Sequence, residues 1–304
     1  DVMNPFTHSV VMVRPAAFGF NDETSLNNFF QDSSQKNNKQ LQALALEQFE
    51  EMLQLLRSHE LKVWVLEDTV TPQKPDAIFP NNWFCCNNGV ISIFPMCAQN
   101  RRTEKRPELI EAIKKITGIT QVNDWSTYEE VKQYLEGTGS MIFDHEFRII
   151  YACVSVRTDE NLFYQFCSQL KYTPILFSAA DEKGNEIYHT NVMMCIGKGF
   201  AVVCLDAITN AIERKIVVHE LATTGHEIIN ISFDQMQNFA GNMLQLKTEK
   251  DELLLVMSST AYNILSAWQL ESLRKYSAII TPHVSHIEKA SGGSVRCMMA
   301  ELFY

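Results

Sequence analysis

Residues 136–154, EGTGSMIFDHEFRIIYACV, contain the pattern that decides the fold of this chain. A glycine-containing turn at 136–140 leads into an apolar strand at 141–144, and a polar turn separates this strand from a second one at 148–154. Helical spacing of apolar residues follows at 158–170, before a third strand. The stretch therefore predicts a unit of strand, hairpin turn, strand, helix and strand.

The same unit recurs along the whole chain at a nearly constant spacing. Its turns can be aligned on five small or polar residues, whose successive separations are 57, 52, 51 and 52 residues. These residues are Asn82, Gly139, Asn191, Asn242 and Ser294. Further helices are predicted in the intervals, at 107–116, 207–215 and 260–275. A period of about 50 residues is typical of radial or stacked repetition.

The two ends of the chain complement each other. The fifth unit, which begins at 293–297, reaches the C-terminus without a second strand. Residues 9–14 (SVVMVR) form an apolar strand that precedes a predicted helix at 40–59 and a strand at 62–66. Pairing of the first strand with the C-terminal one would close a ring of five units. We therefore predict one α/β domain over residues 1–304, a five-bladed α/β propeller, in preference to two domains.

The composition indicates a soluble protein that handles small molecules. The chain has 46% hydrophobic residues and 26 Lys and Arg against 36 Asp and Glu, a net charge of −10, which argues against nucleic acid and anionic membranes as partners. No run approaches the roughly 18 apolar residues of a membrane span, and residues 1–5 lack an export signal. Eight scattered cysteines without a CxxC pair predict free thiols in the cytoplasm, and the isolated His283/His286 pair does not predict a metal site.

Closure of the ring has a consequence for function. The equivalent turns of the five units would point into one central cavity, where ligand sites commonly form. The polar residues of these turns are Asn82, Glu136, His189, Asn242 and Cys297. Because Cys297 follows a glycine pair that allows close approach, the sequence predicts a nucleophilic thiol here. The alternative is a small buried side chain, as in most free cysteines.

Several motifs resemble those of the guanidino-group-modifying, or pentein, superfamily of arginine deiminases, dimethylargininases, succinylarginine dihydrolases and amidinotransferases. EGTGS at 136–140 is similar to the deiminase EGGD element, HTN at 189–191 to the family's His-x-Asp, and GGSVRCM at 292–298 to the GG-x-x-CM ending. The resemblance covers nearly the whole chain and extends especially to bacterial arginine-deiminase-related proteins, also called citrulline-utilisation hydrolases. It implies the pentein fold. The implied catalytic residues are the nucleophile Cys297, the histidine His189 and the acid Glu136.

The resemblance also implies residues that bind the substrate. Segment 89–104 is similar to the deiminase segment whose arginine holds the substrate α-carboxylate, which points to Arg101. SVRT at 155–158 resembles the segment with a second carboxylate-binding arginine, here Arg157, although two extra residues intervene after the glutamate. Asn21, in the loop after the first strand, is a further candidate for substrate contact.

Two departures from the family pattern bear on the substrate. Arginine deiminases hold the cationic guanidinium with two aspartates, and the matching positions here are Asn82 and Asn191. A carboxylate stabilises a buried cation, whereas an amide offers one acceptor and donors that a cation cannot use. The amides suit a neutral ureido group, as in citrulline, or a cation whose charge is met by Glu136, Asp76 or Asp144. Succinylarginine dihydrolases share an Asn-Asn pair at the first position, so arginine derivatives remain alternatives.

We therefore predict a cysteine-dependent hydrolase that cleaves C–N bonds of an arginine- or citrulline-like amino acid with a free α-carboxylate. Cys297 would form a covalent intermediate, and His189 would protonate the departing amine and then activate water, so that ammonia is released without a metal or organic cofactor. An amidinotransferase, which uses the same residues with an amine acceptor, is the first alternative. A non-catalytic binding member of the fold is the second. The resemblance also implies a homodimer.

Overall fold

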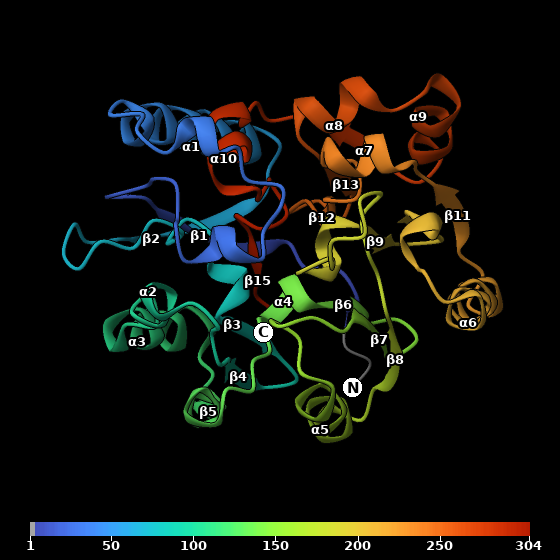
Figure 1. Ribbon diagram of the computed structural model, residues 1–304, viewed down its shortest axis with the longest axis horizontal. Coiled ribbons are helices and arrows are strands. Elements are labelled where there is room, and N and C mark those ends of the chain that lie inside the picture. The colour runs from blue at the N-terminus through green and yellow to red at the C-terminus, as the bar shows by residue number, and fades with distance from the viewer. Residues whose placement is uncertain (1–3) are drawn as a thin grey trace.

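The computed structural model describes residues 4–304, which form five three-stranded sheets around a common centre (Figure 1). Residues 1–3, part of the stretch that is predicted to lack an export signal, lie outside that range. In four sheets an antiparallel hairpin is followed by a third strand parallel to its second. These strands are β3 (Phe84–Asn87), β4 (Val90–Ile93) and β5 (Gln121–Asp124); β6 (Met141–Asp144), β7 (Ile149–Cys153) and β8 (Thr173–Phe177); β9 (Met194–Gly197), β10 (Phe200–Val203) and β11 (Glu227–Asn230); and β12 (Leu244–Lys247), β13 (Leu253–Val256) and β14 (Ala278–Ile280). The predicted repeat is confirmed.

The fifth sheet joins the two ends of the chain. It contains β15 (Ala300–Glu301), β1 (Ser9–Arg14) and β2 (Lys62–Glu67), with β1 in the middle. β1 is antiparallel to β15 and parallel to β2, the same arrangement as in the other sheets. The prediction that the N-terminal strand completes the fifth unit is therefore confirmed.

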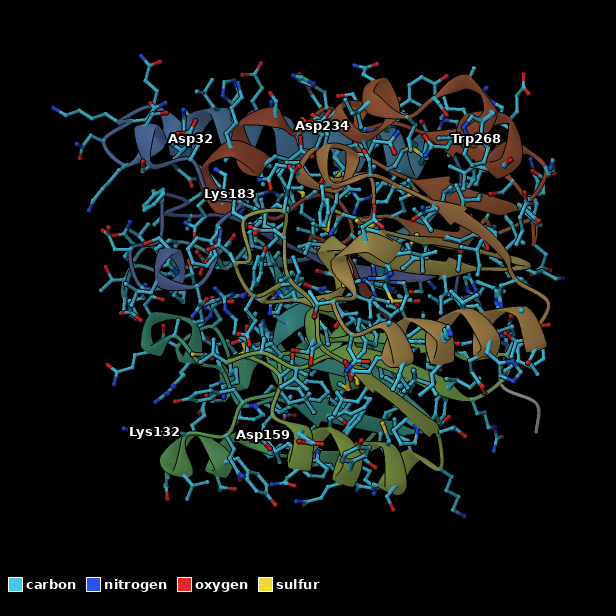
Figure 2. All side chains as sticks on the ribbon, turned by 45° about the vertical axis from the view of Figure 1, so that its right-hand side comes forward. Asp32, Lys132, Asp159, Lys183, Asp234 and Trp268 are labelled. Atoms are coloured by element: carbon cyan, nitrogen blue, oxygen red, sulfur yellow. The ribbon has the colours of Figure 1, made fainter. Side chains whose placement is uncertain are left out.

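Helices on the outside of the sheets connect the second strand of each sheet to its third (Figure 1). A parallel pair of strands needs such a crossover, because a tight turn can join only antiparallel strands. The crossover helices are α1 (Leu41–Ser58), α3 (Pro107–Thr117), α5 (Glu160–Leu170), α6 (Ala211–Thr223), and the pair α8 (Ser259–Ile264) and α9 (Ala267–Arg274). Asp159, near the lower edge of Figure 2, caps α5 by accepting a hydrogen bond from the backbone N of Leu162.

Two predicted helices differ from the observed ones. The helix predicted at 207–215 is wrong in its bounds, because the side chain of Asn210 accepts hydrogen bonds from the next turn and α6 begins only at Ala211. The helix predicted at 260–275 is divided into α8 and α9. Ser266 forms a capping box with Gln269, which starts a new helix at Ala267.

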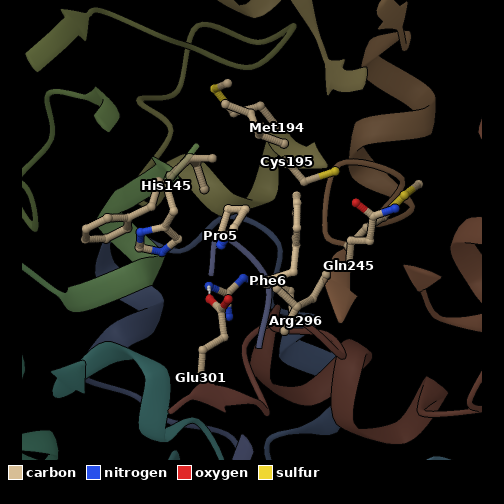
Figure 3. Close-up of a pocket in the computed structure, with 13 residues that line it drawn as sticks. Pro5, Phe6, His145, Met194, Cys195, Gln245, Arg296 and Glu301 are labelled. Atoms are coloured by element: carbon tan, nitrogen blue, oxygen red, sulfur yellow. Dashed lines mark hydrogen bonds and ion pairs between the residues drawn. The ribbon is translucent and has the colours of Figure 1, made fainter. Parts of the chain in front are cut away.

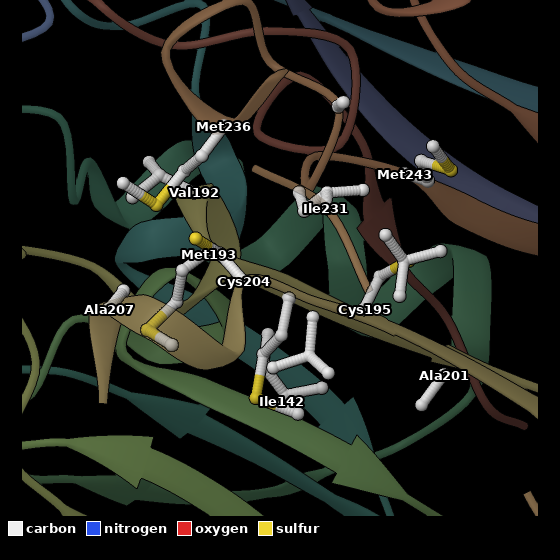
Figure 4. Close-up of a cluster of buried hydrophobic side chains, with 14 of the residues drawn as sticks. Ile142, Val192, Met193, Cys195, Ala201, Cys204, Ala207, Ile231, Met236 and Met243 are labelled. Atoms are coloured by element: carbon white, nitrogen blue, oxygen red, sulfur yellow. The ribbon is translucent and has the colours of Figure 1, made fainter. Parts of the chain in front are cut away.

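Neighbouring sheets pack on one another through their first strands. Ile142 of β6, Cys195 of β9 and Met243, which precedes β12, belong to one buried apolar cluster (Figure 4). Short helical segments stand immediately before the first strands: η3 (Pro80–Asn82) before β3, α4 (Gly137–Ser140) before β6 and η5 (Thr190–Val192) before β9. All residues of these segments are buried. No helix within residues 4–304 is long and apolar enough to cross a membrane.

Candidate active site

The turns that precede β3, β9 and β15 line one pocket with about 260 Å³ of empty space, whereas, within residues 4–304, the turns before β6 and β12 contribute no lining residue, contrary to the prediction that all five do. Of the residues predicted for the site, it is lined by Asp76, Asn82, Arg101, Arg157, His189 and Cys297. Glu136 and Asn191 lie directly behind His189 and Cys297, to which they are hydrogen-bonded. The structure thus brings together side chains that are more than 200 residues apart in the sequence, between Asp76 and Cys297.

Cys297 lies in a turn between α10 (Ser285–Ser291) and β15, and it is buried. Its backbone N donates to the carbonyl of Ser294, which closes the turn. The sulfur accepts hydrogen bonds from two side-chain amides, from Nδ2 of Asn191 at 3.2 Å and from Nδ2 of Asn242 at 3.3 Å. The thiol is therefore surrounded by donors, which suit a sulfur that carries negative charge.

Glu136 and His189 form a buried pair, with 2.7 Å between Oε1 of the carboxylate and Nε2 of the imidazole. The backbone N of Cys97 donates to the other oxygen, Oε2, at 2.9 Å, and Arg157 Nη1 lies 3.6 Å from Oε1. Burial alone would raise the pKa of Glu136, but the hydrogen bond from His189 and the charge of Arg157 outweigh it and lower the pKa to about 2. The carboxylate is consequently ionised at neutral pH.

The protonation of His189 follows from this geometry. Burial lowers its pKa to about 4, because the loss of solvation outweighs the attraction of Glu136. An ionised carboxylate can only accept, so in the neutral imidazole the proton is assigned to Nε2 and the lone pair to Nδ1. His189 therefore has a free basic nitrogen at neutral pH.

This buried neutral histidine predicts a loss of stability in mild acid. The folded-state pKa of His189 lies below its unfolded value of about 6.5, so below that pH the unfolded chain binds a proton that the folded chain does not. The contribution of the neutral His189 to the free energy of unfolding is complete above pH 6.5 and is lost as the pH falls towards 4. From pH 7 to pH 5, we expect the wild type to lose roughly 2 kcal/mol more unfolding free energy than His189→Gln.

Urea unfolding at each pH measures this difference, and the exposed His219→Gln is the matched control. Parallel pH profiles for the wild type and His189→Gln would contradict the prediction.

The guanidinium of Arg101 is hydrogen-bonded to other residues of the protein. Its guanidinium donates to both carboxylate oxygens of Glu104 at 2.9 and 3.0 Å and to Oδ1 of Asn82 at 2.7 Å. It also donates to the carbonyls of Asp76 and Phe79. Arg101 thereby fixes the orientation of the Asn82 side chain, with the amide oxygen towards the arginine. The contact of Arg101 with a substrate carboxylate stays a prediction.

Arg157 is held over the ring of Tyr188, with its guanidinium carbon 4.6 Å from the ring centroid. It donates to the side chain of Asn27 and to the carbonyl of Thr24, both in the loop after β1. Because its Nη1 faces Glu136 and the residue lines the pocket, Arg157 contributes positive charge beside the histidine pair.

Several buried polar atoms around the pocket have no hydrogen-bond partner among residues 4–304. Oδ2 of Asp76 accepts from Asn21 and Thr24, whereas its Oδ1 has no partner. Nδ2 of Asn82 and Oδ1 of Asn191 are also unpaired. A buried polar group without a partner is costly, so the atoms of Asp76 and Asn82, which line the pocket, are candidates for contacts with a ligand. Asn21 lies behind Asp76 and does not line the pocket, so it orients this carboxylate.

The structure also adds residues to the pocket that the sequence patterns do not mark. Asn28 and Tyr188 line it: Asn28 donates to the carbonyl of Ser291, and Tyr188 donates to that of Gly292. Tyr188 is adjacent to His189, which is the only sequence signal for it. Asp144, an alternative charge partner for a substrate, does not line the pocket and lies 3.7 Å from His226.

A different cavity, with about 470 Å³ of empty space, is lined by Arg296, Glu301 and His145 (Figure 3). Arg296 and Glu301 form an ion pair of 2.9 Å there. Burial raises the pKa of the Cys195 thiol in its wall to about 12, so this sulfur is neutral. The candidate nucleophile belongs to the other pocket.

Five three-stranded α/β units, with a thiol and an imidazole at a shared pocket and a carboxylate bonded behind the imidazole, are the arrangement of the guanidino-modifying pentein enzymes. Within this class, the family model described as eukaryotic N,N dimethylarginine dimethylhydrolase matches residues 14–304. The chain belongs to the N,N dimethylarginine dimethylhydrolase family, a family of hydrolases that act on guanidino C–N bonds. No curated protein is significantly similar to the chain in sequence.

Solved structures with the same fold confirm the architecture. ArgZ, an arginine dihydrolase from the ornithine–ammonia cycle in cyanobacteria, has 17% identity and a TM-score of 0.76 over 96% of this chain and 40% of that chain. The chain thus spans less than half of full-length ArgZ, whereas 99% of the isolated ArgZ N-terminal domain is covered, with a TM-score of 0.75. A dimethylarginine dimethylaminohydrolase adduct has 14% identity and a TM-score of 0.64 over 97% of this chain and 99% of that chain.

Proposed function

We propose that the chain hydrolyses a C–N bond of an arginine- or citrulline-like amino acid through a covalent intermediate on Cys297. One observation carries the proposal: the thiol, with two amide donors on its sulfur, shares a pocket with a buried neutral histidine that an ionised glutamate orients. The family of hydrolases to which the chain belongs supports the same reaction class.

The residues allow a balanced two-step mechanism. The thiol of Cys297 gives its proton to Nδ1 of His189, and the sulfur attacks the central carbon of the substrate group. The imidazolium, stabilised by Glu136, then protonates the departing nitrogen, the C–N bond breaks and ammonia leaves. In the second step Nδ1 takes a proton from water, the hydroxide adds to the same carbon, and the C–S bond breaks. The proton returns to the sulfur.

The unpaired atoms of the pocket favour a group that contains both an oxygen and N–H donors. Asp76 Oδ1 can accept from a substrate N–H, whereas Asn82 Nδ2, whose orientation Arg101 fixes, can only donate. A ureido group matches both atoms, and a guanidinium would leave the Asn82 donor facing another donor. We infer that a ureido amino acid such as citrulline is the preferred substrate, and its hydrolysis would give ammonia, carbon dioxide and an amine.

Arginine and its derivatives are the main alternatives. ArgZ is described as an arginine dihydrolase in a complex with its substrate, and AgrE has been solved with L-arginine, which supports a substrate with an arginine skeleton. The roles of Arg101 and Arg157 at an α-carboxylate, a homodimer and a cytoplasmic location remain predictions.

Release of ammonia and amine products from citrulline, arginine, N-succinylarginine and N,N-dimethylarginine tests the proposal. We expect turnover of one of these compounds by the wild type, and a loss of about 10³-fold or more in Cys297→Ser, because the hydroxyl is a far weaker nucleophile. Circular dichroism spectra check that the variant is folded. Turnover that survives in folded Cys297→Ser would contradict the proposal, and transfer of the amidino group to added glycine would identify a transferase instead.

A further inference from the structure

Asn242 makes three side-chain hydrogen bonds at the nucleophile. It lies between α7 (Phe233–Gln237) and β12 and is fully buried. Its Nδ2 donates to the sulfur of Cys297 at 3.3 Å and to the carbonyl of Asn191 at 3.2 Å, and its Oδ1 accepts from the backbone N of Arg296 at 2.9 Å. Asn242 therefore touches the reacting sulfur and also fixes the turn that bears it.

The backbone decides which end of this amide faces the sulfur. A flipped amide would place its NH₂ against the N–H of Arg296 and its oxygen against the carbonyl of Asn191, so both of these buried contacts would be repulsive. The NH₂ group of Asn242 is consequently held towards Cys297. The other donor differs, because Oδ1 of Asn191 has no hydrogen-bond partner in the described part of the chain, so no second bond fixes the orientation of that amide.

The position of Asn242 is also fixed by close packing of the main chain. A Cβ atom on the preceding Gly241 would lie 2.7 Å from the carbonyl oxygen of Val192 and 2.8 Å from the carbonyl carbon of Met193. The turn before β12 therefore lies directly against the segment after Asn191. Asn191 and Asn242 occupy equivalent places in two successive repeats, so the two donors on the sulfur arise from the repetition of the fold.

We propose that Asn242 is a catalytic residue that stabilises negative charge on the sulfur of Cys297. Charge develops there twice, when the thiol loses its proton to His189 and when the C–S bond of the intermediate breaks. A fixed N–H donor strengthens its hydrogen bond to sulfur at both moments and needs no reorganisation. This inference rests on the proposed role of Cys297 as the nucleophile.

The pH dependence of Cys297 alkylation by iodoacetamide tests the inference, with modification of this cysteine followed by peptide mass spectrometry. Asn242→Asp keeps an oxygen for the N–H of Arg296 and replaces the donor by a carboxylate oxygen beside the sulfur. We expect the pH of half-maximal alkylation rate to rise by about one unit or more, because a like charge disfavours the thiolate. Turnover at neutral pH falls by about 10²-fold.

Asn238→Asp, in the same segment but with a side chain whose hydrogen bonds within residues 4–304 go to Asp234 alone, is the control for the added charge and retains the wild-type profile. Asn242→Ser, whose side chain is shorter and uncharged, raises the midpoint by a smaller amount and provides the test if Asn242→Asp does not fold. An unchanged midpoint in a folded Asn242 variant overturns the inference.

The outcome also separates this inference from the proposed function. If Cys297→Ser abolishes turnover but the pH profile of alkylation is the same in an Asn242 variant and in the wild type, only the role of Asn242 is contradicted. Full turnover in Cys297→Ser contradicts the proposed function itself.

Discussion

We expect Glu136→Gln to lower kcat by roughly 10³-fold with little change in the fold. The glutamine has nearly the same shape, but it lacks the negative charge that stabilises His189 when this residue is protonated during the reaction. It also has one oxygen for two buried donors, the imidazole N–H and the backbone N of Cys97, so one donor faces an NH₂ group. Steady-state kinetics on the substrate that the ammonia assay identifies measure the effect.

Glu130→Gln removes the same charge from an exposed position on the preceding segment and is the matched control. A kcat of Glu136→Gln within tenfold of the control value would show that the glutamate does not support the histidine in catalysis.

The largest expected effect on stability is that of Gly137→Ala. Gly137 follows Glu136 and has a φ of +51°, a region that L-residues rarely adopt. A Cβ atom there would lie 2.2 Å from the carbonyl oxygen of Asn81 and 3.1 Å from that of Asn82. Both neighbours are main-chain atoms, so no side-chain rotation relieves the overlap. We expect a loss of roughly 3 to 5 kcal/mol of unfolding free energy, measured by urea denaturation.

Gly184→Ala separates conformational strain from overlap. Gly184 has a φ of +83°, but no atom lies within 4 Å of its added Cβ, so we expect a loss of only about 1 kcal/mol. Equal losses in the two variants would contradict the explanation by close main-chain packing.

The fold could be predicted because each repeat carries its own local sequence signals for strands, turns and a helix. Apolar strands, polar hairpin turns and helical spacing recur every 50 residues or so, and the missing strand of the fifth repeat has a counterpart at residues 9–14. The bounds of α6 and the division between α8 and α9 could not be predicted, because single side chains, Asn210 and Ser266, decide them.

The sequence predicts which residues belong to the candidate site better than it predicts which atoms these residues contact. The motifs marked His189, Glu136 and Cys297, and the structure places His189 and Cys297 at one pocket with Glu136 hydrogen-bonded behind the histidine. They did not indicate that Arg101 donates to Asn82, because this contact depends on how the segment with Arg101 packs on the turn before β3. Asn28, in the loop after β1, lines the pocket. The sequence could not predict this, because the loop has no periodic pattern.

The shared sheet of β1 and β15 affects how a newly made chain matures. Val11 of β1 pairs with Ala300 of β15, so the ribosome makes β1 long before the partner strand on this edge. Domains usually fold in the order of synthesis, whereas this central strand has one edge open until β15 has been made. The turn with Cys297 directly precedes β15. A nascent chain that lacks β15 consequently has an unpaired strand edge at β1 and no assembled nucleophile.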